Sequence, residues 1–390
     1  MSKNKKFQTG NVLTVAFAHF IHDTYSSFLA PILPLLISSL GLSIFQAGML
    51  DFVRKIPSLL NPFLGIVADK FSVKYFLIIA PALTATAMSL LGISNNFWVL
   101  LVLVFISGLG SSIFHVPAPV IVKEFSGKNL GRGLSFYQVG GELARTVGPL
   151  IIIGAISLWT LKGTYRLMPF GILASLFLFF KIRSTEIHTN KKKDNKKVKH
   201  TLKAYAPLFI SITGIVLFRS AMKAALSTFL PIYLTSKGSS LWFSGISLSI
   251  FQFAGTFGTL FLGSISDKLG RKNILIFISI VNPILMFLFL ISKGIFLLPV
   301  LLVTGFVLLG STPIILAMVQ EYGSDNLAFV NGIYMTIGFV ASSIMVLLIG
   351  FLSDKIGMVI TYKITAFIAL GAIPFAFSLP KEKAKSGEKV

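Results

Sequence analysis

The chain has 390 residues, of which 54% are hydrophobic and only 12% are charged, a composition typical of proteins with many membrane-spanning helices. It contains no cysteine, which excludes disulfides and cysteine-based metal or redox chemistry. The formal net charge of +22 would suggest a nucleic-acid partner in a soluble protein. In a membrane protein it is explained by basic cytoplasmic loops, so no nucleic-acid binding is expected.

Twelve apolar stretches are long enough to cross a bilayer, which takes about 20 helical residues each. The first follows three lysines, as a signal peptide would, but it is too long and carries polar residues, so we expect it to be retained as a helix. In chain order the predicted spans are 11–39, 43–68, 74–94, 98–122, 133–158, 163–182, 204–235, 241–266, 273–292, 295–320, 327–352 and 358–379.

The distribution of lysine and arginine predicts the orientation in the membrane. With both termini in the cytoplasm, 24 of these residues lie on that side and 6 on the opposite side, as the positive-inside rule requires. Residues 183–203 carry two lysine runs, and we expect a solvated linker there rather than a nucleic-acid or lipid-headgroup site. The predicted fold is an all-α, multi-pass protein of the cytoplasmic membrane, with six-helix bundles at 1–182 and 204–390.

The two halves resemble each other at an offset near 197 residues. Internal repetition in a twelve-helix protein is typical of transporters that alternate access around a site between their halves. The sequence therefore predicts two pseudo-symmetric bundles. At this offset Pro34, Glu124, Asn129, Tyr137 and Gly141 fall on Pro231, Glu321, Asn326, Tyr334 and Gly338.

A charged loop motif follows the second and the eighth predicted spans. An aspartate at a helix end can hold basic side chains in one conformer and release them in another. Both copies resemble the signature loop of the major facilitator superfamily, although the first has Ser72 and Val73 where glycine and arginine are usual. The resemblance implies a gating role for Asp69, Lys70, Lys74, Asp267, Lys268, Arg271 and Lys272.

Further stretches resemble the fosmidomycin-resistance branch of that superfamily. They are His19-Phe20-Ile21-His22-Asp23-Thr24, residues 110–117 (GSSIFHVP), residues 136–141 (FYQVGG) and Gly148-Pro149. The resemblance implies efflux of small molecules, including a phosphonate antibiotic, driven by the proton gradient and without a cofactor. The fourth predicted span lacks the arginine that is usual in many drug–proton antiporters of the superfamily. Any proton coupling must therefore run through other residues.

The ionisable residues of the first predicted span form the first candidate site. His19, His22 and Asp23 are spaced i, i+3 and i+4 and therefore share one helix face. A charge at the centre of a membrane helix costs at least about 2.5–3.5 kcal/mol, so this face is expected to line a protein interior or a water-filled cavity. Histidine titrates near neutral pH. We predict that Asp23 and His22 carry protons; the alternative is simple hydrogen bonding to neighbouring helices.

Other polar residues within the spans extend this candidate site. Glu142 and Arg145 are expected to pair, either permanently or until a proton or substrate breaks the pair, and Glu142 is a third candidate for proton coupling. Arg219 and Lys223 repel each other unless an anion or a carboxylate lies between them. The predicted substrate contacts are His19, His115, Gln138, Arg145, Arg219, Lys223, Gln252 and Tyr334.

A second charged cluster is formed by Asp51, Arg54 and Lys55, nearer the outer side of the membrane. We expect it to act as an outer gate or as a structural ion pair. Glu124 and Glu321 end their helices at the cytoplasmic face and are expected to bind basic loop residues. Within the spans, five fixed bases then stand against three acids, which favours an anionic or phosphonate-like substrate.

The leading prediction is a monomeric secondary transporter, surrounded by membrane lipids, that exports a small anionic compound in exchange for protons. A divalent metal-ion carrier remains open, because His19, His22, Asp23 and His115 are ligand types that suit a transition metal. An importer of an organic acid or a sugar phosphate also remains open, since the fold does not fix direction. No nucleophile–base set, P-loop or soluble catalytic domain is visible in the sequence, so neither an enzyme nor a receptor is expected.

Overall fold

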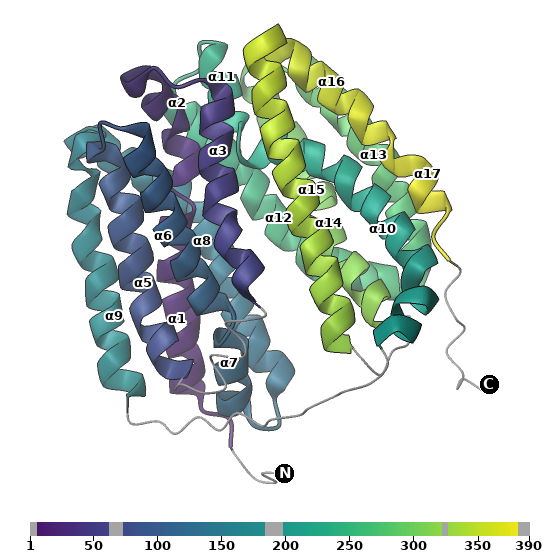
Figure 1. The fold of residues 1–390 in the computed structure, drawn as a ribbon, viewed down its shortest axis with the longest axis horizontal. Helices are drawn as coiled ribbons and strands as arrows, with labels where there is room; N and C mark the ends of the chain where they lie inside the picture. The colour runs from purple at the N-terminus through teal and green to yellow at the C-terminus, as the bar shows by residue number, and fades with distance from the viewer. Residues whose placement is uncertain (1–5, 62–72, 184–197, 322–326, 381–390) are drawn as a thin grey trace. The chain divides into compact units, whose positions relative to one another are not determined.

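The computed structural model describes residues 6–61, 73–183, 198–321 and 327–380, and its regular elements are all helical (Figure 1). Within these residues, eleven helical stretches are long and apolar enough to cross a membrane. The second predicted span is described only as α3 (Ile44–Lys55) and the short 3-10 helix η1 (Ile56–Leu60), because residues 62–72 lie outside the described part. The count of twelve spans and the cytoplasmic position of the termini stay predictions.

The first compact unit comprises residues 1–192 and 228–249. Within it, α1 packs against α8, α5 and α9, so the predicted site on α1 is surrounded by other helices (Figure 1). Besides α3 and η1, its elements are α1 (Thr9–Ser26), α2 (Leu29–Leu40), α5 (Val73–Ser89), η2 (Leu90–Ile93), α6 (Phe97–His115), α7 (Ala118–Ser126), α8 (Leu130–Trp159), η3 (Lys162–Leu167), α9 (Met168–Ile182), α11 (Leu230–Ser236) and the start of α12 (Leu241–Leu269).

The second compact unit comprises residues 193–227 and 250–390. In this unit α10 packs against α15, α16 and α17, and α13 packs against α14. The predicted division at 183–203 stays a prediction, and residues 228–249 group with the first unit. Besides the end of α12, its elements are α10 (Val198–Ser227), α13 (Arg271–Ile291), η4 (Gly294–Phe296), α14 (Leu297–Glu321), α15 (Leu327–Ile356), α16 (Met358–Leu370) and α17 (Ala372–Phe377).

Breaks near prolines divide three of the predicted spans into two helices each, although the first and the fourth remain single stretches of membrane length. The first span is two helices, α1 and α2, separated at Ser27. Pro31 has no N–H to donate to the Ser27 carbonyl, and its ring crowds that carbonyl. The fourth span breaks in the same way at Pro117, and the seventh breaks just before Pro231. As a result Asp23 lies in the last turn of α1, close to the break, rather than inside one continuous helix.

One lysine in each unit binds a backbone carbonyl at the end of a helix. Lys74 Nζ donates to the backbone carbonyl of Arg183 at 2.6 Å, where α9 ends. Lys272 Nζ donates to the backbone carbonyl of Leu379 at 2.5 Å, just after α17. Carbonyls at helix C-termini lack intrahelical partners, and a lysine stabilises them. The two lysines match at an offset of 198 residues, so the sequence repeat has a structural counterpart.

Candidate functional site

Helix α1 approaches α8 closely because α8 carries glycines at the contact. A β-carbon at Gly140 would overlap the backbone carbonyl of Ala16, and one at Gly141 would overlap the ring of His19. Such overlaps are not tolerated in a close-packed interior, so these positions accept only glycine without rearrangement. The glycines therefore allow the polar face of α1 to contact α8 directly.

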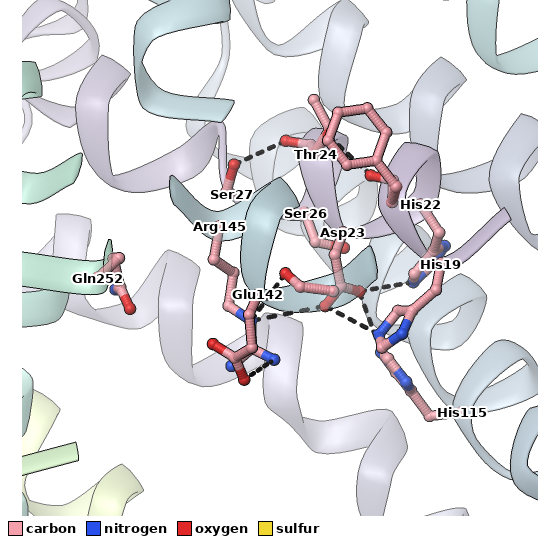
Figure 2. Close-up of polar contacts among 12 residues, drawn as sticks. His19, His22, Asp23, Thr24, Ser26, Ser27, His115, Glu142, Arg145 and Gln252 are labelled. Carbon is pink, nitrogen blue, oxygen red and sulfur yellow. Dashed lines mark hydrogen bonds and ion pairs between the residues drawn. The ribbon is translucent and has the colours of Figure 1, made fainter. Parts of the chain in front are cut away.

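Side chains from three helices converge on the carboxylate of Asp23, which is 6% exposed (Figure 2). Asp23 Oδ1 lies 3.2 Å from His115 Nε2 on α6. Asp23 Oδ2 lies 3.3 Å from His19 Nε2 on α1 and 3.6 Å from Arg145 Nε on α8. This group of four residues is called the Asp23 cluster below.

The hydrogen bonds of His19 fix where its proton lies. His19 Nδ1 is 2.7 Å from the backbone carbonyl of Tyr137, and because a carbonyl only accepts, Nδ1 carries a hydrogen and donates it. In the neutral ring the other nitrogen, Nε2, then presents a lone pair on the side of the Asp23 carboxylate. Two acceptors at 3.3 Å repel each other unless one proton lies between them. This arrangement of His19 and Asp23 therefore favours one shared proton.

The other two histidines differ in how they approach Asp23. The side chain of His22 is completely buried and stacks on Phe114, with ring centroids 4.6 Å apart, and its Nε2 is 3.9 Å from Asp23 Oδ1. The side chain of His115 is 37% exposed, and its Nδ1 lies 3.1 Å from the hydroxyl of Tyr137. His115 is therefore better placed than His22 to connect the buried carboxylate with solvent.

Glu142 and Arg145 form the predicted ion pair, with 3.0 Å between Glu142 Oε1 and one terminal nitrogen of Arg145. The Nε of the same guanidinium faces Asp23 and also donates to the carbonyl of Gly141 at 3.4 Å. One arginine is thus shared between two carboxylates on different helices. A change in the charge of either carboxylate changes how strongly the other holds Arg145.

The Asp23 cluster also contains a donor set that could hold a metal ion. One ligand atom each from His19, Asp23 and His115 lies within 4.8 Å of the others. Two imidazoles and one carboxylate suit a divalent transition metal. Arg145, however, places a fixed positive charge beside Asp23, which disfavours a bound dication.

The predicted outer cluster is present within the first unit. Asp51 is buried and binds one terminal nitrogen of Arg54 at 2.8 Å and Lys55 Nζ at 2.7 Å. The hydroxyl of Thr228 donates to the same carboxylate at 3.0 Å. Arg54 also donates to the backbone carbonyl of Ser26, which links α3 to the end of α1. Asp51 and Arg54 together thus connect three segments that are distant in the sequence.

A paired arginine begins α13. Arg271 makes two hydrogen bonds to the carboxylate of Glu321, both 2.7 Å long, and lies 2.7 Å from Asp267. This is the contact expected for Glu321 with a basic loop residue. Lys268, by contrast, is exposed. Two further residues of the predicted gating set lie outside the described residues: Asp69 and Lys70.

Several predicted substrate residues are not part of the Asp23 cluster. Gln138 lies on α8, but its side chain is exposed. Arg219 and Tyr334 are buried in the second unit, whereas Lys223 is exposed and Gln252 is half-buried. Arg219 and Lys223 therefore do not share one environment, although their spacing places them on one helix face.

Sequence reasoning did not assign a role to two residues that make these contacts. Tyr137 accepts the His19 proton through its carbonyl and contacts His115 through its hydroxyl. A signal was available, because Tyr137 matches Tyr334 in the repeat and Tyr334 was already a candidate. Thr228, the partner of Asp51, has no such signal, since a lone threonine near a helix end usually has only a local role.

Comparisons with known proteins agree with this architecture. Residues 15–346 match the family model described as Major Facilitator Superfamily. The chain is 28% identical over 364 residues to a fosmidomycin resistance protein of Escherichia coli (strain K12), covering 91% of this chain and 89% of that protein. It is 25% identical to the multidrug resistance protein MdtG of Serratia proteamaculans (strain 568), covering 71% of this chain and 70% of that protein.

A solved structure shows the same fold at low sequence identity. A bacterial homolog of the human lysosomal transporter Spinster superposes with a TM-score of 0.81 at 13% identity, covering 96% of this chain and 97% of that chain. Together with the eleven membrane-length helices, these matches identify a multi-pass protein of the cytoplasmic membrane. The chain belongs to the Major Facilitator Superfamily of transporters.

Proposed function

We propose that this transporter exports a small anionic compound in exchange for protons, by alternating access and as a monomer. The observation that carries the proposal is the arrangement of His19 and Asp23, in which a nitrogen lone pair and a carboxylate lie 3.3 Å apart. The pair is stable when it holds a proton and repulsive when it does not. A site with these two states can couple proton movement to a conformational change.

Loss of the shared proton would change the balance of charges in the Asp23 cluster. The ionised carboxylate then turns to its remaining cationic neighbour, Arg145, now 3.6 Å away. Arg145 also binds Glu142, so a stronger bond to Asp23 weakens the pair on α8. Proton release is thereby transmitted from α1 to α8, and His115 provides the path between the carboxylate and solvent.

Two observations support an anionic substrate. Relatives of this chain are named for fosmidomycin resistance and for multidrug resistance, and fosmidomycin is a phosphonate. Within the predicted spans, fixed basic residues outnumber acidic ones by five to three. A surplus of positive charge at membrane depth attracts anions and repels lipophilic cations.

The proposal is tested with purified protein in liposomes that carry an imposed pH gradient. Exchange predicts that an acidic interior drives uptake of radiolabelled fosmidomycin, because protons leave as the substrate enters. Asp23→Asn keeps the size of the side chain but cannot ionise, and we expect gradient-driven uptake to fall about tenfold or more, with the loss of one charge-assisted interaction. Asp354→Asn is the matched control, because that carboxylate is exposed at the end of α15.

Four other results would contradict the proposal, each in a different part. Full gradient-driven uptake by Asp23→Asn would refute the coupling role of Asp23. Uptake driven by an acidic exterior instead would indicate an importer. Transport of lipophilic cations with no response to organic anions would contradict the substrate class. Calorimetric binding of zinc or nickel that is lost in Asp23→Asn would favour a metal-ion carrier.

A further inference from the structure

The second unit contains a buried arginine that no carboxylate neutralises. Arg219 on α10 is 8% exposed, and one terminal nitrogen donates to the hydroxyls of Ser311 and Thr312 on α14. In the part of the chain that the structure describes, no acidic side chain pairs with it, and its Nε has no hydrogen-bond partner. Among titratable side chains, Arg219 interacts electrostatically with Tyr334, whose phenol is neutral at physiological pH and so supplies no negative charge.

Neutral partners do not compensate a charge at this depth. Arginine keeps its proton at any physiological pH, so the guanidinium cannot escape the cost of burial by becoming neutral. An unpaired ion in a helix bundle is strongly unfavourable, and buried charges in proteins are paired or bound to a counter-ion. Two hydroxyl groups supply hydrogen-bond acceptors but no negative charge. The site therefore requires a negative charge that the neighbouring residues do not supply.

A small cavity lies beside this guanidinium. Its volume of about 10 Å³ is just large enough to hold a single water molecule or an ion of similar size. Helices α10, α13, α14 and α16 contribute its walls, together with Ala372 at the start of α17, and most of the lining is apolar. The polar lining residues are Arg219, Ser279, Asn282 and Ser311.

The hydrogen bonds around the cavity show which donors are available. The hydroxyl of Ser279 donates to the Leu275 carbonyl and that of Ser311 to the Leu308 carbonyl, each at 2.7 Å. Both hydroxyl hydrogens are therefore in use. The side-chain oxygen of Asn282 has no hydrogen-bond partner among the described residues, and an amide can present either its oxygen or its NH₂ to a ligand. The Nε–H of Arg219 is a donor without a partner, and the Asn282 amide can turn its NH₂ toward the same cavity.

We propose that this cavity binds one halide ion, which neutralises Arg219 within the second unit. A monatomic anion fits a site of about one water molecule, can accept from Arg219 and Asn282, and supplies the single negative charge that is missing. A phosphonate or carboxylate group is too large for the cavity in this conformation. The proposal is independent of the transported substrate, and it differs from the sequence-based expectation that Arg219 contacts that substrate.

The experiment compares thermal unfolding of the purified protein in sodium chloride, sodium bromide, sodium sulfate and sodium gluconate at matched ionic strength. We expect the wild-type melting temperature to rise saturably with chloride or bromide, and to rise less with sulfate or gluconate, whose anions exceed the cavity. Arg219→Gln should abolish the halide effect, and Asn282→Leu should weaken halide affinity about tenfold, as the loss of one hydrogen bond to a charged group predicts. Lys223→Gln, one turn further along α10 and exposed, is the matched control and should keep the full effect.

Crystals of the wild-type protein grown in bromide provide a second measurement that does not depend on a variant being folded. An anomalous bromide peak in the cavity beside Arg219 supports the proposal, and no peak at saturating bromide overturns it. Equal stability in halide and gluconate also overturns it, as does a halide effect that persists in Arg219→Gln. If fosmidomycin stabilises the protein through Arg219 while halides do not, the guanidinium binds substrate and the halide site is refuted.

Discussion

Gly141 lies so close to the imidazole of His19 that a β-carbon there would overlap both Cε1 and Nε2 of the ring. The ring is also held by the hydrogen bond to the Tyr137 carbonyl and by stacking on the Tyr137 ring, with centroids 4.0 Å apart. We therefore expect Gly141→Ala to push Nε2 away from Asp23. Gradient-driven uptake should fall about tenfold or more, and overpacking should lower stability by about 1–3 kcal/mol.

The control for this change is Gly131→Ala on the same helix. No atom lies within 4 Å of a β-carbon at Gly131, in the first turn of α8. Transport should be unchanged, and the better helix propensity of alanine should leave stability equal or raise it by up to about 1 kcal/mol. Proteoliposome uptake and thermal unfolding measure both quantities. Wild-type coupling in Gly141→Ala would show that the position of His19 does not matter for transport.

Replacement of the two histidines nearest Asp23 should have different consequences. His19→Gln loses the stacking and the hydrogen bond of a ring that is 2% exposed, so both coupling and stability should fall, the latter by about 1–3 kcal/mol. His115→Gln affects a half-buried side chain, so stability should hold while the pH dependence of uptake changes. Uptake measured across about pH 5.5–8.5, the range in which histidine changes charge, tests this. Identical pH profiles for His115→Gln and wild type would contradict a role for His115 in proton access.

The two lysines that bind carbonyls at the ends of α9 and α17 should contribute to stability independently. Lys74→Met and Lys272→Met each remove one hydrogen bond to a terminal carbonyl, and each should cost about 1 kcal/mol, or about 2–4 °C in melting temperature. The costs should add within about 0.5 kcal/mol in the double variant, because the two contacts lie in different units. Lys268→Met, an exposed lysine of the same loop as Lys272, should have no effect. A loss of stability in Lys268→Met as large as in Lys272→Met would mean that charge alone, rather than the contact, matters.

The ion pair between Arg271 on α13 and Glu321 on α14 provides a test of geometry. Arg271→Lys keeps the charge but cannot reproduce the two parallel hydrogen bonds to Glu321, so we expect it to be less stable than wild type. A double-mutant cycle of Arg271→Met and Glu321→Gln should give a coupling energy of about 0.5–1 kcal/mol, because half of the Glu321 side chain is exposed and screened. Chemical or thermal unfolding of the four proteins measures it. Purely additive effects would show that the pair contributes nothing to stability.

The Asp23 cluster illustrates which parts of a site helical spacing can predict. The spacing of His19, His22 and Asp23 predicted one face correctly, because a helix has a fixed period. The same period accounts for the closer approach of His19, four residues before Asp23, than of the adjacent His22. It could not predict that His115 reaches the same carboxylate, because His115 lies on α6 and its approach depends on how α6 packs against α1.

The positions of the membrane spans could be predicted from the sequence, whereas the breaks within them could not. Apolar length predicts where spans lie, because the bilayer sets the length. It does not predict where a span is broken, since the effect of Pro31 or Pro117 depends on whether neighbouring helices satisfy the freed carbonyls. The predicted pair of Glu142 and Arg145 is present because both lie on one helix. The contact between Asp51 and Thr228 spans 177 residues of sequence and could be seen only in the structure.

The lysine contacts at the ends of α9 and α17 also bear on how each unit holds together. Lys74 and Lys272 each bind a carbonyl of their own unit, so neither contact requires the other half. Each lysine stands in the first turn of its own helix, so the contact ties the start of one helix to the end of another. Fraying at either of these helix ends would therefore loosen both.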